Sequence, residues 1–291
     1  MFIVSGIELV VACCEAGVLG TFPTLNARST DELGRWLERI AGRLAEFDRA
    51  HPQAPAAPFG VNLIMRSERL QADLEQVVAH QVPVVIPSVG NPAPVVERVH
   101  AYGGLVFADV ATVHHARRAA SAGLDGLILL CAGAGGNTGW LNPFAFVAAV
   151  REFYAGPLVV AGSIANGRAV RAVETLGADY AYVGSRFIPT RESSASDKYR
   201  ELMLRSDADD VILTTAITGI PSNMLRGSLE DAGFFAGQTP RKNPFYFDRT
   251  YTTRSAWKDV WSAGHAVGES KAVASVQEVV GELLREYRAA R

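Results

Sequence analysis

The sequence is poor in cysteine and has no excess charge of either sign. Its three cysteines are Cys13, Cys14 and Cys131. An odd count with two adjacent members excludes a disulfide framework and a Cys-x-x-Cys metal pair. The formal net charge is −2 and the pI is about 6.3, which argues against a nucleic-acid-binding surface over the whole chain. These absences favour a reduced, cytoplasmic protein that acts on a small-molecule substrate.

Long hydrophobic runs are also absent. The longest apolar segments, such as 124–134, are too short to span a bilayer, so no membrane association is expected. No basic segment precedes an apolar stretch at the N-terminus, so the sequence does not support a secretory signal. Hydrophobic residues make up 48% of the chain and charged residues 20%, which excludes intrinsic disorder. A length of 291 residues suits one large α/β barrel or two ordinary domains.

Short and uniformly apolar segments recur through the first two thirds of the chain. Such segments are typical of parallel strands that are buried on both faces. Alanine- and arginine-rich segments with helical character, such as 112–122 and 167–176, separate them. Seven candidate strands precede residue 190: 18–22, 59–64, 83–86, 105–107, 126–130, 157–160 and 180–183.

This alternation predicts an α/β fold, a TIM (β/α)8 barrel with one strand unaccounted for. A doubly wound sheet is the alternative, but it would concentrate its ligand loops near one switch point. The turn-rich segment 190–255, with helix-like stretches at 196–205 and 222–232, is interpreted as an inserted lid or substrate domain. Residues 1–189 would form the barrel, and residues 256–291 would be C-terminal helices that return to it.

Glycine-rich loops follow the last two candidate strands. They are the segments 161–168, with Gly162 and Gly167, and 183–187, with Gly184 and Ser185. In a (β/α)8 barrel, the loops after strands 7 and 8 commonly bind phosphate through backbone N–H groups. Glycine allows the backbone to approach the anion closely, and Ser185 adds a hydroxyl donor. The alternative is that these glycines only form tight turns.

A third glycine cluster, 132–140, includes Gly135 and Gly136. So many glycines let the backbone lie flat against a ligand, and a flat ring with a phosphate tail in the neighbouring loops suggests FMN. A sugar phosphate would satisfy the phosphate loops but would not need the flat wall.

The sequence resembles the nitronate monooxygenase (2-nitropropane dioxygenase-like) family of FMN flavoproteins. The resemblance covers nearly the whole chain and implies a TIM barrel with an inserted helical domain and a non-covalent FMN. By position it implies that Asn62 contacts the flavin or its ribityl chain, and that Gly162, Gly184 and Ser185 hold the phosphate. The matching motifs are 17–23, 57–63, 123–128, 132–136, 142–146, 161–165, 184–188 and 257–268.

The sequence departs from the family pattern in two places. The family opens with a strand that leads into a segment like the one at Met1, so we expect the first barrel strand upstream of Met1. In the family, the Gly-Ala-Gly-Gly run is followed by a histidine, the expected base that removes the proton α to the nitro group. Here that position is Asn137. A carboxamide cannot take a proton at neutral pH, although it can donate a hydrogen bond to an oxyanion.

Two further residues are candidates for the site. His265 stands where family members often have glutamine near the flavin, although a packed or capping histidine is an equally ordinary interpretation. Asp109 follows a strand at its C-terminal end and should face the barrel mouth. Asp125 precedes its strand, so a structural role is expected, and His100 is expected to be solvated without a partner.

Three functional interpretations remain open at this stage. The first is an FMN-dependent oxidoreductase that oxidises nitronates or similar activated carbon acids with O₂. The second is an NAD(P)H-dependent flavin reductase of enoyl thioesters or quinones, because loss of the base fits hydride transfer. The third is a flavin-binding protein without turnover. In each case the protein could form a homodimer.

Overall fold

The computed structural model describes residues 1–217, 219–234 and 260–290, and its centre is a curled sheet of parallel strands. The strand order is β1-β2-β3-β4-β5-β7-β8, so each strand pairs with its neighbour in the chain apart from the small β6. The strands are β1 (Gly20–Pro23), β2 (Phe59–Ile64), β3 (Val84–Ser88), β4 (Leu105–Val110), β5 (Gly126–Leu130), β7 (Leu158–Ala161) and β8 (Tyr180–Tyr182).

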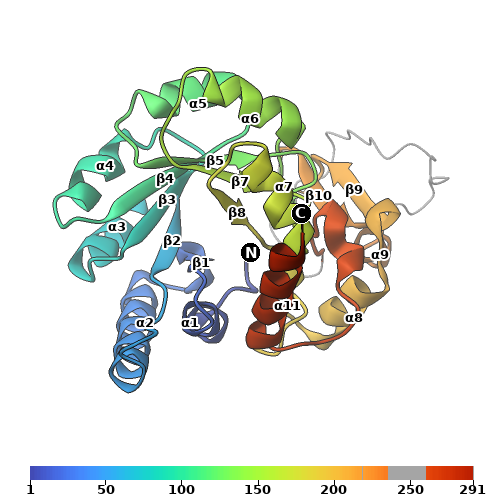
Figure 1. The fold of residues 1–291 in the computed structure, drawn as a ribbon, viewed down its shortest axis with the longest axis horizontal. Coiled ribbons are helices and arrows are strands. Elements are labelled where there is room, and N and C mark those ends of the chain that lie inside the picture. The colour runs from blue at the N-terminus through green and yellow to red at the C-terminus, as the bar shows by residue number, and fades with distance from the viewer. Residues whose placement is uncertain (218, 235–259, 291) are drawn as a thin grey trace.

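Helices on the outside of the curl connect these strands (Figure 1). Side chains on the outward face of the strands, such as Val61, Val106 and Leu127, are completely buried under this helical layer. Inward side chains, such as Ile86 and Ile128, form a separate cluster inside the curl. This burial on both faces confirms the prediction from uniformly apolar strands. The helices are α2 (Thr30–Ala50), α3 (Leu70–Ala79), α4 (Ala93–His100), α5 (Val113–Ala120), α6 (Pro143–Arg151) and α7 (Gly167–Thr175).

The first and last strands, β1 and β8, lie at the two ends of the sheet, and the N-terminus lies between them (Figure 1). Their side chains meet across this interval, because the Thr21 and Tyr182 hydroxyls are 2.7 Å apart. The curled sheet with its outer helices confirms the predicted TIM-barrel class. Within the described residues no strand occupies the interval, and the expectation of a strand upstream of Met1 stays a prediction.

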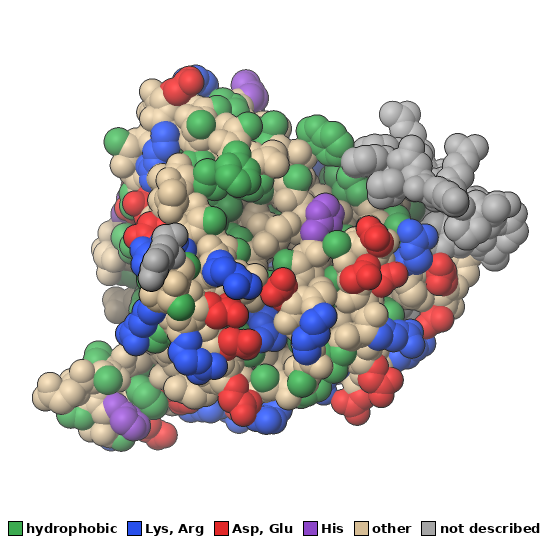
Figure 2. Space-filling view, turned by 45° about the vertical axis from the view of Figure 1, so that its right-hand side comes forward, with side chains coloured by type: hydrophobic (Ala, Val, Ile, Leu, Met, Phe, Trp, Pro, Cys, Tyr) green, Lys and Arg blue, Asp and Glu red, His purple; other side chains and the backbone are tan. Residues whose placement is uncertain are grey.

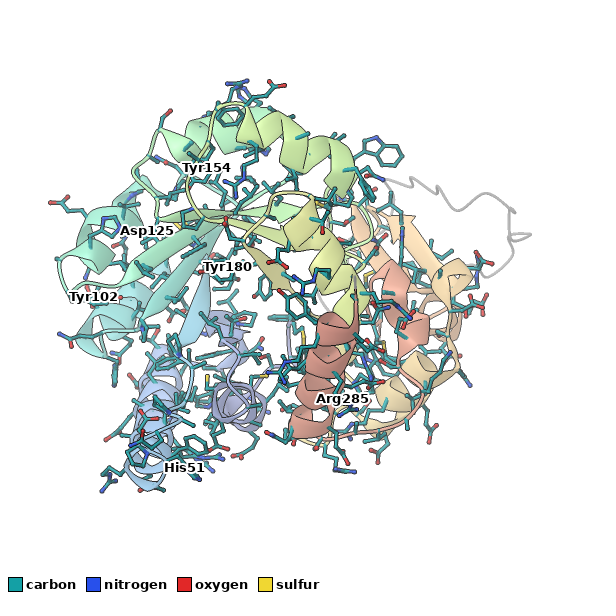
Figure 3. The ribbon with its side chains drawn as sticks, in the orientation of Figure 1. His51, Tyr102, Asp125, Tyr154, Tyr180 and Arg285 are labelled. Carbon is teal, nitrogen blue, oxygen red and sulfur yellow. The ribbon has the colours of Figure 1, made fainter. Side chains whose placement is uncertain are left out.

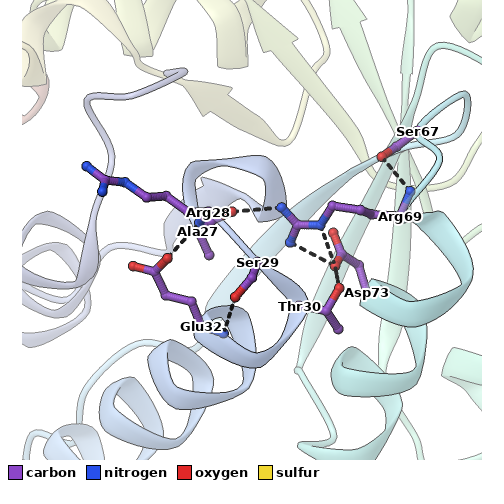
Figure 4. Close-up of polar contacts among 8 residues, drawn as sticks. All are labelled: Ala27, Arg28, Ser29, Thr30, Glu32, Ser67, Arg69 and Asp73. Carbon is purple, nitrogen blue, oxygen red and sulfur yellow. Dashed lines mark hydrogen bonds and ion pairs between the residues drawn. The ribbon is translucent and has the colours of Figure 1, made fainter.

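Polar contacts fix the loops that follow β1 and β2 (Figure 4). Asp73 on α3 is buried, and its Oδ1 accepts hydrogen bonds from Thr30 Oγ1 at 2.8 Å and from Arg69 Nη2 at 2.9 Å. Arg69 also donates to the carbonyl of Ala27 at 2.8 Å. The start of α2 is therefore tied to α3, at the end of the barrel where the strands finish.

The segment after β8 is mixed rather than purely helical. It holds α8 (Asp197–Arg205), β9 (Val211–Thr214), β10 (Ser222–Leu225) and α9 (Arg226–Asp231). The helix expected over 222–232 is wrong in its first four residues, because they form β10 and are buried between two partners. Those partners are β9 and the short β6 (Gly136–Asn137) of the glycine-rich loop. Residues 235–255 of the predicted insertion lie outside the described residues.

The described C-terminal part packs against the barrel. It contains the 3₁₀ turn η4 (His265–Glu269) and helix α11 (Val276–Ala289), which packs against α7. A capping box between Ser275 and Glu278 starts α11. Acidic and basic side chains are interspersed on the face shown in Figure 2. Arg171 on α7 forms an ion pair with Glu174 on the same helix.

Candidate functional site

The predicted site residues lie at the carboxyl ends of the strands or just beyond them, where (β/α)8 barrels place their sites. Figure 3 labels residues of the opposite end, such as Tyr180 at the start of β8 and Asp125 before β5. Asp125 accepts a hydrogen bond from the Val106 N–H at 2.7 Å, which is the structural role expected for it. His100 lies 2.7 Å from the same carboxylate, so the expectation that it has no partner is wrong.

The two predicted phosphate loops emerge side by side. Strands β7 and β8 pair in register, with Ala161 opposite Tyr182, so the loops that follow them start at the same edge. Gly162 has φ +133° and Ser163 has φ +57°, which turns the backbone sharply directly after β7. Within the described part of the chain, the N–H groups of Gly162, Ser163, Gly184 and Ser185 meet no protein acceptor. Adjacent free N–H groups in such turns form an anion-binding concavity.

Gly184 gives the clearest sign of a ligand. Its φ of −115° is open to any residue, so the backbone conformation does not require glycine. A Cβ added there would meet only the Met1 side chain, whose sulfur is 3.8 Å away. Packing therefore does not require glycine either. The open volume beside two free N–H groups is a cradle that a side chain would fill and an anion fits.

The neighbouring polar groups are already paired within the protein. Ser185 Oγ accepts a hydrogen bond from the Gly264 N–H at 2.8 Å, and the hydroxyl retains its own proton as a donor. The buried guanidinium of Arg186 pairs with Glu282 on α11. The Gly167 N–H donates to Glu286 Oε2 at 2.7 Å, so it is occupied and a negative charge lies beside it. An anion in these loops would thus be held by N–H groups rather than by Arg186 or Gly167.

The third glycine cluster packs against the protein's own chain. A Cβ on Gly135 would lie 2.7 Å from the backbone N of Gly264, and a Cβ on Gly139 would overlap the Leu130 carbonyl. A Cβ on Gly133 would lie 3.0 Å from the His265 ring. Gly136 has φ +70°, a conformation that favours glycine. Internal packing thus accounts for the glycines of this loop, and their number alone does not require a flat ring.

Asn137 lies in β6, with its side chain exposed. It is paired in register with Ser222 of β10, whose hydroxyl oxygen lies 2.9 Å from Asn137 Oδ1 and donates to it. The hydrogen bond leaves the Asn137 NH₂ group as the free donor of this side chain. The structure thus joins Asn137 to β10, and the side chain presents a hydrogen-bond donor rather than a base.

His265 begins η4, and its backbone N–H donates to the Gly133 carbonyl at 3.0 Å. Partial burial lowers the pKa of its imidazole, which keeps the ring neutral at physiological pH. A neutral imidazole can accept a proton. Asn137 belongs to the glycine-rich loop and His265 is bonded to it through Gly133, so the loop has a donor in one side chain and a potential acceptor beside it.

Asn62 and Asp109 lie on the inward faces of β2 and β4, and Ser88 at the end of β3 connects them. Asn62 Nδ2 donates to Ser88 Oγ at 2.5 Å and to the Ile86 carbonyl at 2.9 Å. Ser88 Oγ donates to Asp109 Oδ2 at 2.5 Å. Burial raises the pKa of Asp109, while the Ser88 hydrogen bond and the nearby Met1 amino group oppose this.

Sequence reasoning missed Ser88, Tyr182 and Ser222. The first two share a usable signal: each is a polar residue at the carboxyl end of an apolar strand, at an inward position. Burial raises the pKa of Tyr182 to about 12. Ser222 has no such signal, because its relation to Asn137 depends on the pairing of β6 with β10.

The family model described as nitronate monooxygenase matches residues 1–286. The chain belongs to the nitronate monooxygenase family. A nitroalkane oxidase structure from Streptomyces ansochromogenes superposes with a TM-score of 0.81 at 25% identity, covering 99% of this chain and 93% of that one. FabK from Thermotoga maritima shares the fold, with a TM-score of 0.77 at 24% identity over 98% of this chain and 90% of that one.

Two curated relatives come from Mycobacterium tuberculosis. A putative monooxygenase is 33% identical over 160 residues, which are 54% of this chain and 43% of the relative. A (3aS,4S,5R,7aS)-5-hydroxy-7a-methyl-1-oxo-octahydro-1H-indene-4-carboxyl-CoA dehydrogenase is 27% identical over 229 residues, 78% of this chain and 61% of the relative. The matched segments thus span less than two thirds of these relatives. In the described ranges of this chain, no helix is long and apolar enough to cross a membrane.

Proposed function

We propose that this protein is an FMN-dependent oxidoreductase that oxidises nitronates or similar activated carbon acids, with O₂ as the electron acceptor. The observation that carries the proposal is the cradle beside Gly184, an open volume lined by free N–H groups at the carboxyl ends of β7 and β8. Membership of the nitronate monooxygenase family supports the same cofactor and reaction class.

The residues of the site fit FMN. The N–H groups of Gly162, Gly184 and Ser185 would hold its phosphate, and Asn62 would offer its carbonyl oxygen to a donor of the ring or the ribityl chain. FMN, when bound, supplies the two-electron redox chemistry that these side chains lack. The protein contributes binding, orientation and electrostatics around it.

Asn137 determines which form of the substrate suits the site. Its NH₂ group, oriented by Ser222, would donate to a nitro or carbonyl oxygen and stabilise negative charge there. It cannot remove a proton from a neutral nitroalkane. A nitronate has already lost that proton, so it needs only positioning. We therefore expect the substrate to enter as the anion, or His265 to act as the base.

The cofactor proposal is tested by the absorption spectrum and by one pair of variants. The purified protein should show flavin absorption, and Gly184→Leu should lose it because the side chain fills the cradle. Gly42→Leu is the matched control, since Gly42 is an exposed helical glycine with no atom near its Cβ position. A fully flavin-loaded Gly184→Leu protein would place the phosphate elsewhere.

A second candidate is an NAD(P)H-dependent flavin reductase of enoyl thioesters or quinones. The donor at Asn137 favours it, because hydride transfer to an activated carbonyl compound needs an oxyanion donor rather than a base at this position. The name of the M. tuberculosis relative, a carboxyl-CoA dehydrogenase, supports a thioester substrate class. NAD(P)H should bleach the flavin rapidly only if this second function holds. Bound flavin without turnover on nitronates, quinones and enoyl thioesters would indicate a binding protein.

A further inference from the structure

Three inward side chains on consecutive strands form a hydrogen-bonded chain inside the barrel. Asn62 on β2 donates to Ser88 on β3, and Ser88 donates to Asp109 on β4, at 2.5 Å in both cases. Ser88 is buried, whereas Asn62 and Asp109 are partly exposed toward the interior. We call these three residues the interior ladder. The function proposed above uses only its first member, Asn62.

The chemistry at both ends of the ladder fixes the direction of its hydrogen bonds. The Ile86 carbonyl can only accept, so the amide nitrogen of Asn62 must face it. Ser88 Oγ receives the second amide proton of Asn62, so its own proton is available for Asp109 Oδ2, to which it donates. Both protons of the Asn62 amide are thereby used. Its Oδ1 is left as an acceptor for whatever binds beside β2.

The groups that face Asp109 come from several elements. Ser88 approaches from β3, the Met1 amino group from the N-terminal segment, and Tyr182 from β8. Tyr182 is neutral, because burial raises its pKa to about 12. Asp109 is thus the acidic end of a polar chain that runs across the barrel interior.

We propose that Ser88 and Asp109 are positioning residues. They hold Asn62 as a hydrogen-bond acceptor for the bound cofactor, and they lower the reduction potential of that cofactor. This inference rests on the proposed FMN site. An acceptor that is part of a hydrogen-bonded chain ending in a carboxylate is strengthened by the polarisation of that chain. Negative charge near the cofactor also disfavours the electron pair that reduction adds.

The test uses the whole chain and two readouts other than turnover. One is the dissociation constant of FMN for the apoprotein, and the other is the midpoint potential of the bound flavin. Ser88→Ala breaks the ladder and retains the Asp109 carboxylate, whereas Ser88→Thr retains the hydroxyl and is the matched control. Asp109→Asn removes the acidic end with almost no change in size. Unfolding temperatures of all variants show that each is folded.

We expect Ser88→Ala to bind FMN about fivefold more weakly, the effect of one lost hydrogen bond. Ser88→Ala and Asp109→Asn should both shift the reduction equilibrium about tenfold toward the reduced flavin, which is about 30 mV for a two-electron couple. Ser88→Thr should behave as the wild type. Wild-type affinity and potential in Ser88→Ala would overturn the ladder while leaving FMN binding intact. A wild-type protein that binds no FMN would instead refute the proposed function.

Discussion

The resemblance leads us to expect a histidine base where this chain has Asn137, which makes a quantitative prediction about substrate form. A positioned general base contributes ~10²–10⁴-fold to a rate. A neutral nitroalkane needs that base and a preformed nitronate does not. If no other group takes the proton, the ratio of kcat/KM for nitronate over nitroalkane should be ~10²–10⁴, the full contribution of the missing base. The assay is oxygen consumption with each form of one compound, measured before the two forms equilibrate.

The structure indicates how the base could be restored. Asn137 is exposed and lies on a two-residue strand, so Asn137→His introduces an imidazole without displacing a packed side chain. The Ser222 hydroxyl is placed to hydrogen-bond to one ring nitrogen, which leaves the other free. We expect this variant to gain activity on the neutral nitroalkane alone. Asn137→Ala is the control, and it should slow nitronate turnover without any gain on the neutral form.

His265 is the group that would lower the ratio of kcat/KM for nitronate over nitroalkane. Its lowered pKa means that the imidazole is already unprotonated at pH 7, so it can act as a base there and loses this capacity only as the pH falls below its lowered pKa. In that case His265→Gln should lose activity on the nitroalkane and retain activity on the nitronate. Equal turnover of both forms in the wild type, unchanged by either substitution, would refute the reasoning about the base.

Three further predictions concern stability and reactivity. Asp73→Ala should lower the free energy of unfolding by about 2–3 kcal/mol in chemical denaturation, because it leaves Arg69 without its buried partner; a loss below 0.5 kcal/mol would contradict this. The thiols of Cys13, Cys14 and Cys131 should react with a disulfide reagent only after unfolding, because burial raises their pKa values to about 12, 11 and 12. Fast reaction of the native protein would contradict this prediction. Gly167→Ala should lower the unfolding temperature, because the added Cβ would overlap the α11 backbone. An unchanged unfolding temperature together with weaker FMN binding would instead support a role for Gly167 in the phosphate site.

The strands and their order could be predicted from the sequence because each strand is buried on both faces and therefore uniformly apolar. β5 (Gly126–Leu130) is an example, and its bounds match the prediction. The strand β10 could not be predicted in this way. Its partner β6 is distant in the chain, and its residues Ser222 and Asn223 are polar but buried through contacts with the glycine-rich loop.

In the candidate site, too, some features could be predicted from the sequence and others depend on contacts between distant segments. The glycines drew attention to three loops, but the sequence does not say which atoms lie beside each glycine. Gly184 borders an open volume, Gly135 borders the Gly264 backbone, and Gly167 borders α11. Packing accounts for the last two and not for the first. The interior ladder could not be predicted for a related reason. Its members Asn62, Ser88 and Asp109 are far apart in sequence and meet only when β2, β3 and β4 pair.

The chain leaves the barrel and re-enters it at one point. Thr190 and Ala274 form an isolated parallel bridge, and the Arg191 N–H donates to the Ala274 carbonyl at 3.0 Å. The Glu192 carboxylate then accepts from the N–H of Val276, the first residue of α11. These contacts fasten the two ends of the intervening segment to each other, so the position of α11 does not depend on what lies between them. The described part of that segment is not free to vary throughout, because Gly264 donates to Ser185 and Asn223 donates to the Ala134 carbonyl. Variation in evolution, or by grafting, is therefore expected to spare these two contacts.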